Sequence, residues 1–317
     1  MIWLFWGILI ALAVLVCAWL LSGLFLFRRA CRRCVPGSVG KEENPKGAGK
    51  RYFDLIRQGV RFCGEHFPEE VWIRKDELWQ HAFWVDNGSD RTAVVVHGYG
   101  GHALDRYWRV PYYTARGFNV LLPDLRAHGS SEGRWIGFGA PEGSDVCEWV
   151  RWLRKNAGKP QRVLLDGVSM GAASVLIASG ADDLPELRLV LADCGFTSAW
   201  DEFRYLLRKV PGLLRTPLLL AANLWNRAFT GFDLRSPSAL EAAAHSRVPT
   251  LFVHGQKDDF VPPEMSERLF AACAAPKELL RVKDAGHALS FAADEAEYTA
   301  RLDGMIQQYI PPTETEV

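Results

Sequence analysis

The chain begins with a run of apolar residues that contains no charged side chain. Residues 1–27 read MIWLFWGILIALAVLVCAWLLSGLFLF. As a helix this run extends about 40 Å, which is enough to cross a hydrocarbon core roughly 30 Å thick. A cleaved signal peptide has a basic segment before a shorter apolar stretch, and neither is present here. A helix in a soluble core would need shielding on every side. The pattern therefore predicts a transmembrane helix at residues 1–27.

Basic residues lie on only one side of this helix. Arg28, Arg29, Arg32 and Arg33 follow it directly, and no basic residue precedes it. Cytoplasmic flanks of membrane helices are enriched in Lys and Arg. We therefore expect a single-pass anchor in the cell membrane, with the N-terminus outside and the folded part in the cytoplasm. Residues 28–51, rich in Gly, Pro and charge, then form a basic juxtamembrane linker.

Beyond residue 51 the hydrophobic pattern becomes that of a folded domain. A helix is predicted at residues 52–67, and alternation across 71–85 around three polar residues predicts a hairpin of two strands. Six short apolar runs rich in β-branched residues follow, at 92–96, 119–122, 162–165, 187–192, 250–253 and 278–282. Helical patterns lie between most of these runs and after the last, at about 104–116, 142–157, 170–180, 264–274 and 294–310.

Short buried runs that alternate with helices predict an α/β domain with a mainly parallel sheet covered on both faces. We place this domain at residues 52–313. Residues 195–248 interrupt the alternation with a long, mostly helical insertion between two strands, which we expect to form a lid over the strand ends.

Composition narrows the range of partners. The 37 basic residues balance 37 acidic ones, so no overall field favours nucleic acid as a partner. The seven cysteines are odd in number and scattered, which fits reduced thiols on the cytosolic side better than a disulfide framework. The sequence has no phosphate-binding loop, no dinucleotide fingerprint and no cluster of metal ligands. We therefore expect neither a cofactor nor a metal.

Ser169 lies at a turn with the pattern of a nucleophile. It is the serine of GVSMG, a G-x-S-x-G sequence that a strand at 162–165 precedes and a helix at 170–180 follows. This strand–turn–helix setting is what a nucleophile elbow requires, because it exposes the hydroxyl above the sheet. The start of the helix also adds positive dipole beside a developing oxyanion. The alternative is an ordinary helix cap.

A serine hydroxyl needs a base and a group that orients the base. His287 lies in a loop of small residues between the last strand and the last helix, and is the best base. Asp258 follows another strand, which gives the chain order Ser169, Asp258, His287 of a known type of triad. Asp193, at the end of the preceding strand, is the main competitor for the role of Asp258. Three further histidines are expected to shape the loops that hold them: His97, His128 and His254.

An oxyanion hole needs backbone N–H groups aimed at the developing charge. We expect one from Met170, directly after the serine. The other is expected from Tyr99 in HGYGG, where glycines let the backbone approach the substrate closely. The alternative is a plain glycine-rich turn.

Taken together, these stretches resemble a known superfamily. VVVHGYGG, LLPDLRAHGSSEG, GVSMGAAS, HGQKDDFVP and AGHA occur in the order and spacing of the α/β-hydrolase superfamily, over about residues 70–310. They look most like its bacterial serine-hydrolase branch near the monoacylglycerol lipase and serine aminopeptidase group, which includes membrane-anchored members. The resemblance implies an α/β-hydrolase fold with an eight-stranded, mainly parallel sheet flanked by helices. It implies catalytic Ser169, Asp258 and His287, with Tyr99 and Met170 as oxyanion donors.

The same resemblance makes Asp124 a structural brace in its loop. Asp166, just before the elbow, departs from the pattern, since many relatives have an apolar residue or a histidine there. This departure leaves the elbow intact but is expected to alter the packing around it.

These features predict a membrane-anchored serine hydrolase, of esterase or lipase type, that acts on a small-molecule ester. Large apolar side chains of the insertion, such as Trp200, Phe203 and Trp225, either line an apolar acyl or aromatic pocket or pack the lid onto the domain. Two alternatives stay open. One is a peptidase or amidase that acts on small peptides, because both chemistries share the same site. The other is a membrane-anchored binding protein that keeps the fold without turnover.

Overall fold

The computed structural model describes residues 2–33, 46–66 and 68–313. Half of the predicted juxtamembrane linker, residues 34–45, therefore lies outside the described residues. The linker's first residues continue helix α1 (Ile2–Cys31), which ends four residues beyond the predicted span, and its last residues begin helix α2 (Gly47–His66).

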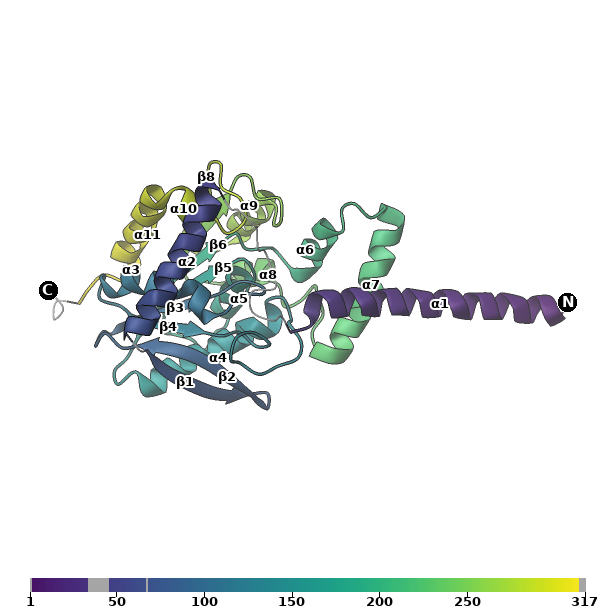
Figure 1. The fold of residues 1–317 in the computed structure, drawn as a ribbon, viewed down its shortest axis with the longest axis horizontal. Helices are drawn as coiled ribbons and strands as arrows, with labels where there is room; N and C mark the ends of the chain where they lie inside the picture. Colours follow the sequence, from purple (N-terminus) through teal and green to yellow (C-terminus); the bar gives the residue numbers. More distant parts are fainter. Residues whose placement is uncertain (1, 34–45, 67, 314–317) are drawn as a thin grey trace.

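A single eight-stranded sheet forms the centre of the fold, with strand order β1-β2-β4-β3-β5-β6-β7-β8 (Figure 1). The strands are β1 (Glu69–Lys75), β2 (Leu78–Val85), β3 (Arg91–Val96), β4 (Asn119–Pro123), β5 (Arg162–Val168), β6 (Leu187–Asp193), β7 (Thr250–Gly255) and β8 (Lys277–Val282). Strands β1 and β2 pair antiparallel as the predicted hairpin, and β2 also pairs antiparallel with β4. All other pairs are parallel. The predicted mainly parallel, eight-stranded sheet is confirmed.

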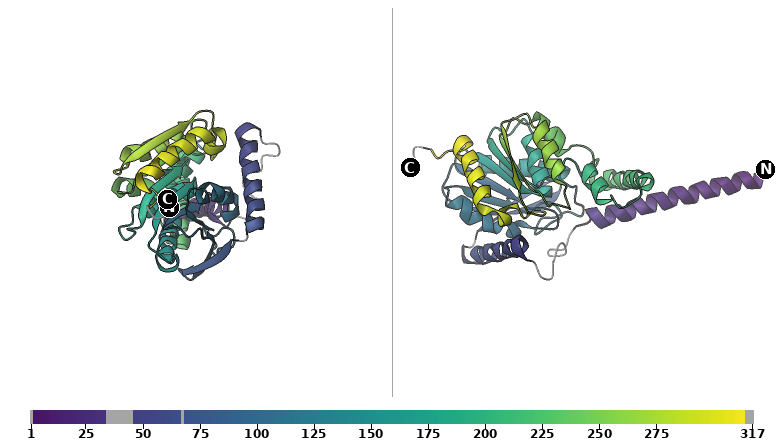
Figure 2. Two further views of the ribbon diagram at one scale, coloured as in Figure 1. Left: turned by 90° about the vertical axis from the view of Figure 1, so that its left-hand side faces the viewer. Right: turned by 90° about the horizontal axis from the view of Figure 1, so that it is seen from above.

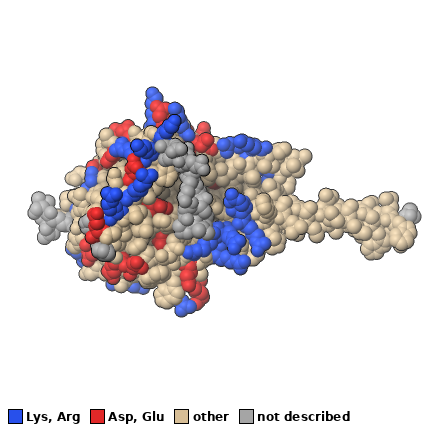
Figure 3. Space-filling view, viewed as in Figure 1, with Lys and Arg blue, Asp and Glu red and all other residues tan. Residues whose placement is uncertain are grey.

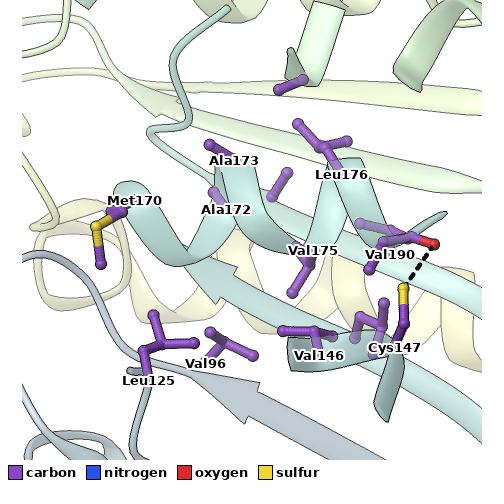
Figure 4. Close-up of a cluster of buried hydrophobic side chains, with 14 of the residues drawn as sticks. Val96, Leu125, Val146, Cys147, Met170, Ala172, Ala173, Val175, Leu176 and Val190 are labelled. Atoms are coloured by element: carbon purple, nitrogen blue, oxygen red, sulfur yellow. Dashed lines mark hydrogen bonds between the residues drawn. The ribbon is translucent and has the colours of Figure 1, made fainter. Parts of the chain in front are cut away.

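Helices cover both faces of this sheet, so successive strand residues are buried on opposite sides. In β3, Val94 and Val96 belong to one core cluster and Val95 to the other. The remaining helices are η1 (Ala103–Arg109), α3 (Val110–Thr114), α4 (Ala140–Asn156), α5 (Met170–Ser179), α6 (Ala199–Leu206), α7 (Gly212–Thr230), α8 (Ala239–His245), α9 (Pro263–Ala272), α10 (Ser290–Ala293) and α11 (Glu295–Tyr309). Figure 4 shows the apolar contact between α5, α4 and the end of β3, with Val96 beside Leu125.

One predicted helix is divided in the structure. The pattern at 104–116 predicts a continuous helix, but the chain forms the 3₁₀ helix η1 and then the short helix α3. Pro111 lies in the first turn of α3. Because proline has no N–H, it cannot donate the helical hydrogen bond that would join α3 to the preceding turn.

Helix α1 extends away from the sheet (Figures 1 and 2), and α7 crosses the half of α1 nearest the body, with α6 between α7 and the sheet (Figure 1). Among the described residues it is the one helix long and apolar enough to cross a membrane, with a mean hydropathy of 2.7 over its best window. Its projecting part carries no charged side chain, and Lys and Arg side chains gather where it meets the body (Figure 3). By contrast, Phe27 and Cys31 near its end are buried in the core. Helix α1 is therefore a candidate membrane span whose C-terminal end belongs to the folded domain.

The helices of the predicted insertion occupy two places. Helix α7 packs across α1 (Figure 1), where the indole of Trp225 donates to the carbonyl oxygen of Leu20 and that of Trp19 to the carbonyl oxygen of Pro217, at 2.9 Å and 2.7 Å. Helix α8 instead packs against α5 and α9 in the layer of helices on the sheet. The part of the insertion that stands off the sheet therefore consists of α6 and α7.

Candidate active site

Ser169 occupies a sharp turn between β5 and α5, in a backbone conformation that few side chains tolerate. Its φ and ψ are 56° and −118°, a strained region that is found mainly at functional sites. The flanking glycines are required by close packing. A Cβ on Gly167 would lie 2.4 Å from the carbonyl oxygen of Gly171, and one on Gly171 would lie 2.5 Å from the carbonyl oxygen of His97. The predicted strand–turn–helix setting is present, and an ordinary cap does not need this geometry.

The structure brings Ser169, His287 and Asp258 into one hydrogen-bonded chain. Nε2 of His287 lies 2.9 Å from Oγ of Ser169, and Nδ1 of His287 lies 2.7 Å from Oδ2 of Asp258. Ser169 and Asp258 are buried, and the His287 side chain is 24% exposed. The ring of Phe260 packs against the imidazole, with centroids 4.9 Å apart. This is the geometry of a nucleophile, a base and an orienting carboxylate.

Asp258 is held by further partners besides His287. Its Oδ1 accepts hydrogen bonds from the backbone N–H groups of Phe260 and Val261, at 3.0 Å and 2.9 Å. Nε2 of His254 lies 3.2 Å from Oδ2. Burial by itself raises the pKa of Asp258, but the hydrogen bonds from His254 and His287 outweigh it and lower the pKa to about 2. The carboxylate is therefore ionised at neutral pH and fixes the orientation of the imidazole.

The competing carboxylates have other surroundings. Asp193 accepts hydrogen bonds from the hydroxyls of Ser290 and Tyr298, at 3.1 Å and 3.2 Å. Its contact with the nucleophile is through the backbone, where its carbonyl oxygen accepts from the N–H of Ser169 at 2.8 Å. Asp259 is exposed. Of these three carboxylates, Asp258 is the one that contacts Nδ1 of His287.

Tyr99 and Met170, the predicted oxyanion donors, line the same cavity as Ser169. The loop of Tyr99 lies against the elbow, since a Cβ on Gly98 would be 3.3 Å from Cβ of Ser169. The phenol hydroxyl of Tyr99 donates to the carbonyl oxygen of Ala30 in α1, at 2.8 Å. The loop that would carry the oxyanion donor is therefore tied to the candidate membrane helix.

Two histidines hold this loop through hydrogen bonds with the backbone. His97 pairs through Nδ1 with the carbonyl oxygen of Gly98 and through Nε2 with the N–H of Leu125, at 2.7 Å and 3.0 Å. Nε2 of His128 accepts from the N–H of Gly100 at 3.1 Å. Burial lowers the pKa of His128 to about 3, so its ring is neutral and free to accept. Both residues shape the loop, as expected from their positions.

Asp124 and Asp166 anchor the surrounding segments. Oδ1 of Asp124 accepts from the N–H of Ala103 at 2.7 Å, and Oδ2 accepts from the N–H of Ser130 at 2.9 Å, so the residue braces its loop. Asp166, the departure from the family pattern, is fully buried in β5 and pairs with the guanidinium of Arg109 at 2.8 Å. This pair links β5 to the end of η1 just before the elbow. Removing either partner would leave a buried charge without its counter-ion, which is strongly destabilising.

A cavity of about 190 Å³ adjoins the nucleophile. Its walls come from the elbow, from the Tyr99 loop, from α6 and its flanks, and from the end of α1. The residues that line it are Leu26, Arg29, Ala30, Tyr99, Phe138, Ser169, Met170, Phe196, Glu202, Phe203, Leu206, Leu207 and Phe260. The cavity is mostly apolar, and the candidate membrane helix supplies part of its wall.

One group of potential metal ligands occurs among the described residues. The ligand atoms of Cys194, Asp258 and His287 all lie within 4.8 Å of one another. Burial raises the pKa of the Cys194 thiol well above its ordinary value, so the thiol stays protonated and is a poor ligand. Asp258 and His287 also bond to each other. The group therefore belongs to the hydrogen-bonded site of Ser169 and does not resemble a metal centre.

Comparison with known proteins agrees with this fold. The chain belongs to the alpha/beta hydrolase family, whose model matches residues 93–302. It is 28% identical over 223 residues to the uncharacterized protein YqkD of Bacillus subtilis, a match that covers 70% of this chain and 73% of YqkD. It is 30% identical over 256 residues to an uncharacterized protein of Mycobacterium tuberculosis, covering 79% of this chain and 76% of that protein.

Solved structures support the same fold. The esterase Pf2001 of Pyrococcus furiosus superimposes with a TM-score of 0.63 at 24% identity, covering 88% of this chain and 99% of the esterase. At this identity the likeness shows the fold alone. The resemblance to α/β hydrolases that the motifs predict is confirmed.

Sequence reasoning missed several residues of the site. It treated His254 as structural only, although its ring supports Asp258 directly. It did not connect Leu26, Arg29 and Ala30 of α1 with the site, and it did not single out Glu202. No motif marks these residues, because their position depends on how distant segments pack.

Proposed function

We propose that this chain is a serine hydrolase that cleaves carboxylic esters through an acyl-enzyme intermediate. The observation that carries the proposal is the hydrogen-bonded chain from Ser169 through His287 to Asp258, set at a strained elbow beside an apolar cavity. An elbow serine, a base in contact with it and an ionised carboxylate behind the base are the parts that acyl transfer needs.

In the acylation step, Oγ of Ser169 attacks the ester carbonyl carbon while Nε2 of His287 takes its proton. The carbonyl electrons move to the oxygen, and the backbone N–H groups of Tyr99 and Met170 stabilise the oxyanion. When the carbonyl re-forms, the C–O bond to the alcohol breaks and the alcohol leaves with the proton from His287. The acyl group stays on Ser169.

In the deacylation step, His287 takes a proton from water, whose oxygen attacks the acyl carbon. The C–O bond to Ser169 then breaks, Ser169 recovers a proton from His287, and the free acid leaves. Asp258, with its pKa of about 2, stays ionised throughout and stabilises each imidazolium that forms.

The cavity favours an apolar acyl group as the substrate part next to the nucleophile. Aromatic and leucine side chains form most of its walls, and Phe203, Leu206 and Leu207 come from α6 and the turn after it. Its volume of about 190 Å³ holds several water molecules or a short to medium acyl chain. Within the insertion at 195–248, α6 and α7 are the parts we propose as the lid.

We also propose that α1 anchors the enzyme in the cell membrane with the catalytic domain in the cytoplasm. The organisation is then a membrane helix within 1–27, whose last residues pack into the domain, a connecting segment at 28–51 and a hydrolase domain at 52–313. The arginines that directly follow the span support this orientation. Helix α7 packs across α1 (Figure 1) and exposes several leucines, namely Leu213, Leu214, Leu220 and Leu224. Such a surface beside the span suits the membrane interface.

Fluorophosphonate labelling and ester turnover test the chemistry. Ser169→Ala is expected to abolish both labelling and hydrolysis of p-nitrophenyl esters. The control is Ser130→Ala, at an exposed serine outside the cavity. Labelling that persists in Ser169→Ala would remove Ser169 from the role. Faster turnover of aminoacyl amides than of esters would favour the peptidase alternative, and no labelling of the wild-type chain would favour the binding-protein alternative.

Protease treatment of intact cells tests the orientation. A cytoplasmic domain is protected until the membrane is permeabilised. Digestion of the domain from outside would contradict the proposed topology.

A further inference from the structure

Glu202 is a buried acid in the wall of the cavity that also contains Ser169. It lies near the start of α6 and is one of the residues that line the cavity. The residue is 2% exposed, and neither carboxyl oxygen has a hydrogen-bond partner among the described residues. Buried polar groups are nearly always hydrogen-bonded, and an unpaired one destabilises the fold. A side chain in this state, in the wall of a cavity that Ser169 also lines, points to a missing ligand.

The carboxyl group does not serve the helix that carries it. The N-cap of α6 is Ser198, whose hydroxyl accepts from the N–H of Asp201. Asp201 in turn accepts from the hydroxyl of Thr197 and pairs with Arg268. Glu202 takes part in none of these contacts. Local helix stability therefore does not account for an acid at this position.

The surroundings keep this acid neutral. The cavity wall near it is apolar, with Phe196, Phe203 and Leu206 among its residues. Burial, and then the negative charge of Asp258, raise the pKa of Glu202 to about 8, although the charge of Arg208 opposes this. At neutral pH most of the Glu202 side chains are therefore protonated. A protonated carboxyl has an O–H donor and a C=O acceptor, which matches a hydroxyl group in both directions.

We propose that Glu202 is a substrate-binding residue that hydrogen-bonds a hydroxyl group on the acyl chain of the ester. The proposal rests on the proposed function, which places the acyl chain in this cavity. The preferred substrates are then hydroxyacyl esters, and the rest of the chain contacts the apolar wall. A plain acyl chain leaves the carboxyl group unpaired in the complex, and such a mismatch lowers transition-state binding.

Matched substrates and variants of the full-length protein in detergent test this proposal. The substrates are all p-nitrophenyl esters. They are the hexanoate, a series of hydroxyhexanoates with one hydroxyl at each position of the chain, and the 6-aminohexanoate. The variants are Glu202→Leu, which removes the hydrogen bonds, and Glu202→Gln, which keeps a neutral donor and acceptor. Glu65→Leu is the control, because Glu65 is an exposed acid on α2, and α2 lines no part of the cavity.

For at least one hydroxyl position we expect kcat/KM to exceed that of the plain ester by about tenfold. Glu202→Leu should bring this ratio close to one, whereas Glu202→Gln and Glu65→Leu should largely keep it. Equal rates for all positions in the wild-type chain would overturn the proposal. A preference for the hydroxylated ester that persists in Glu202→Leu would also overturn it. So would a preference for the 6-aminohexanoate ester that Glu202→Gln loses, because this would show that Glu202 binds an ammonium group as a carboxylate.

Calorimetry separates this proposal from the proposed function. In the Ser169→Ala background, binding of hexanamide and its hydroxylated analogues reports on the cavity without turnover. Tighter binding of a hydroxylated analogue, lost when Glu202→Leu is added, would support the role of Glu202 even if no ester were hydrolysed. Equal binding of all analogues would overturn it. Thermal unfolding of each variant shows that it is folded, and Glu202→Leu should not unfold earlier, since it removes an unpaired buried acid.

Discussion

The hydroxyl of Tyr99 donates a hydrogen bond of 2.8 Å to the carbonyl oxygen of Ala30. This contact joins the loop that packs against Ser169 to the last turns of α1. The ring of Tyr99 also stacks on Phe138, with centroids 5.1 Å apart. The candidate membrane helix therefore helps to hold the backbone of the active site, in addition to lining its cavity.

Tyr99→Phe tests whether this contact positions the loop. The variant keeps the ring on Phe138 but loses one hydrogen bond, which is worth about 0.5–1.5 kcal/mol. We expect kcat/KM for p-nitrophenyl esters to fall by about 2- to 10-fold, with fluorophosphonate labelling retained. Tyr205→Phe, which removes a lid hydroxyl outside the cavity lining, should keep the wild-type rate. An unchanged rate in Tyr99→Phe would mean that the tether does not influence the site.

Leu26→Trp tests whether α1 forms part of the acyl pocket. Leu26 lines the cavity, and a larger side chain there should shorten the space for the acyl chain. We expect kcat/KM for octanoate esters to fall about tenfold while acetate esters are little affected. Leu21→Trp is the matched control, because Leu21 is 64% exposed on the same helix. Equal losses of kcat/KM for octanoate and acetate esters would indicate general damage to the fold. Wild-type kcat/KM for both esters would place the acyl chain elsewhere.

Asp258→Asn tests the orienting carboxylate. The change keeps the shape of the side chain but removes the charge that orients and stabilises the imidazolium of His287, so we expect kcat to fall by about 10⁴-fold. Asp259→Asn, at the exposed neighbouring acid, should behave as the wild type. Steady-state ester hydrolysis measures both. Wild-type activity in Asp258→Asn would give the role to Asp193 or Asp259.

The lowered pKa of Asp258 should also make the free energy of unfolding depend on pH. Its pKa of about 2 in the folded protein lies below the ordinary value of 3.8, so the folded state binds its proton less readily than the unfolded chain. The resulting stabilisation is fully present above about pH 4 and is lost as the pH falls towards 2. We expect this group to account for a loss on the order of 1 kcal/mol between pH 6 and pH 3. Urea unfolding in detergent should show a smaller loss over that interval in Asp258→Asn.

Two glycine substitutions should have opposite effects on stability. In Gly171→Ala the new Cβ would lie 2.5 Å from the backbone oxygens of Val96 and His97, and backbone cannot move away cheaply. We expect a loss of about 1–3 kcal/mol or more together with lost activity. Gly304→Ala in α11 meets no atom within 4 Å and should stabilise by about 0.4–1 kcal/mol. Thermal unfolding checks both, and a neutral Gly171→Ala would contradict the close packing of the elbow.

Patterns within short segments predicted much of the fold. The apolar runs gave the strands of the parallel sheet, because a strand buried on both faces has no polar side. The absence of charge before Arg28 indicated α1, because a helix surrounded by lipid has no polar side either. G-x-S-x-G between a strand and a helix located Ser169, since the elbow is built almost entirely from neighbours in the chain.

Relationships between distant segments could only be read from the tertiary structure. Asp193 and Asp258 both follow strands, so the pattern makes both of them candidates. Packing directs Asp258, and not Asp193, to Nδ1 of His287. The division of the helix at 104–116 and the return of α8 to the sheet layer depend likewise on what each segment meets. Local spacing was enough to predict which residues can do chemistry and where strands and helices form, because it fixes burial and turns. The packing of segments far apart in the chain places the end of α1 in the cavity wall and leaves Glu202 in that wall without a hydrogen-bond partner for its carboxyl group among the described residues.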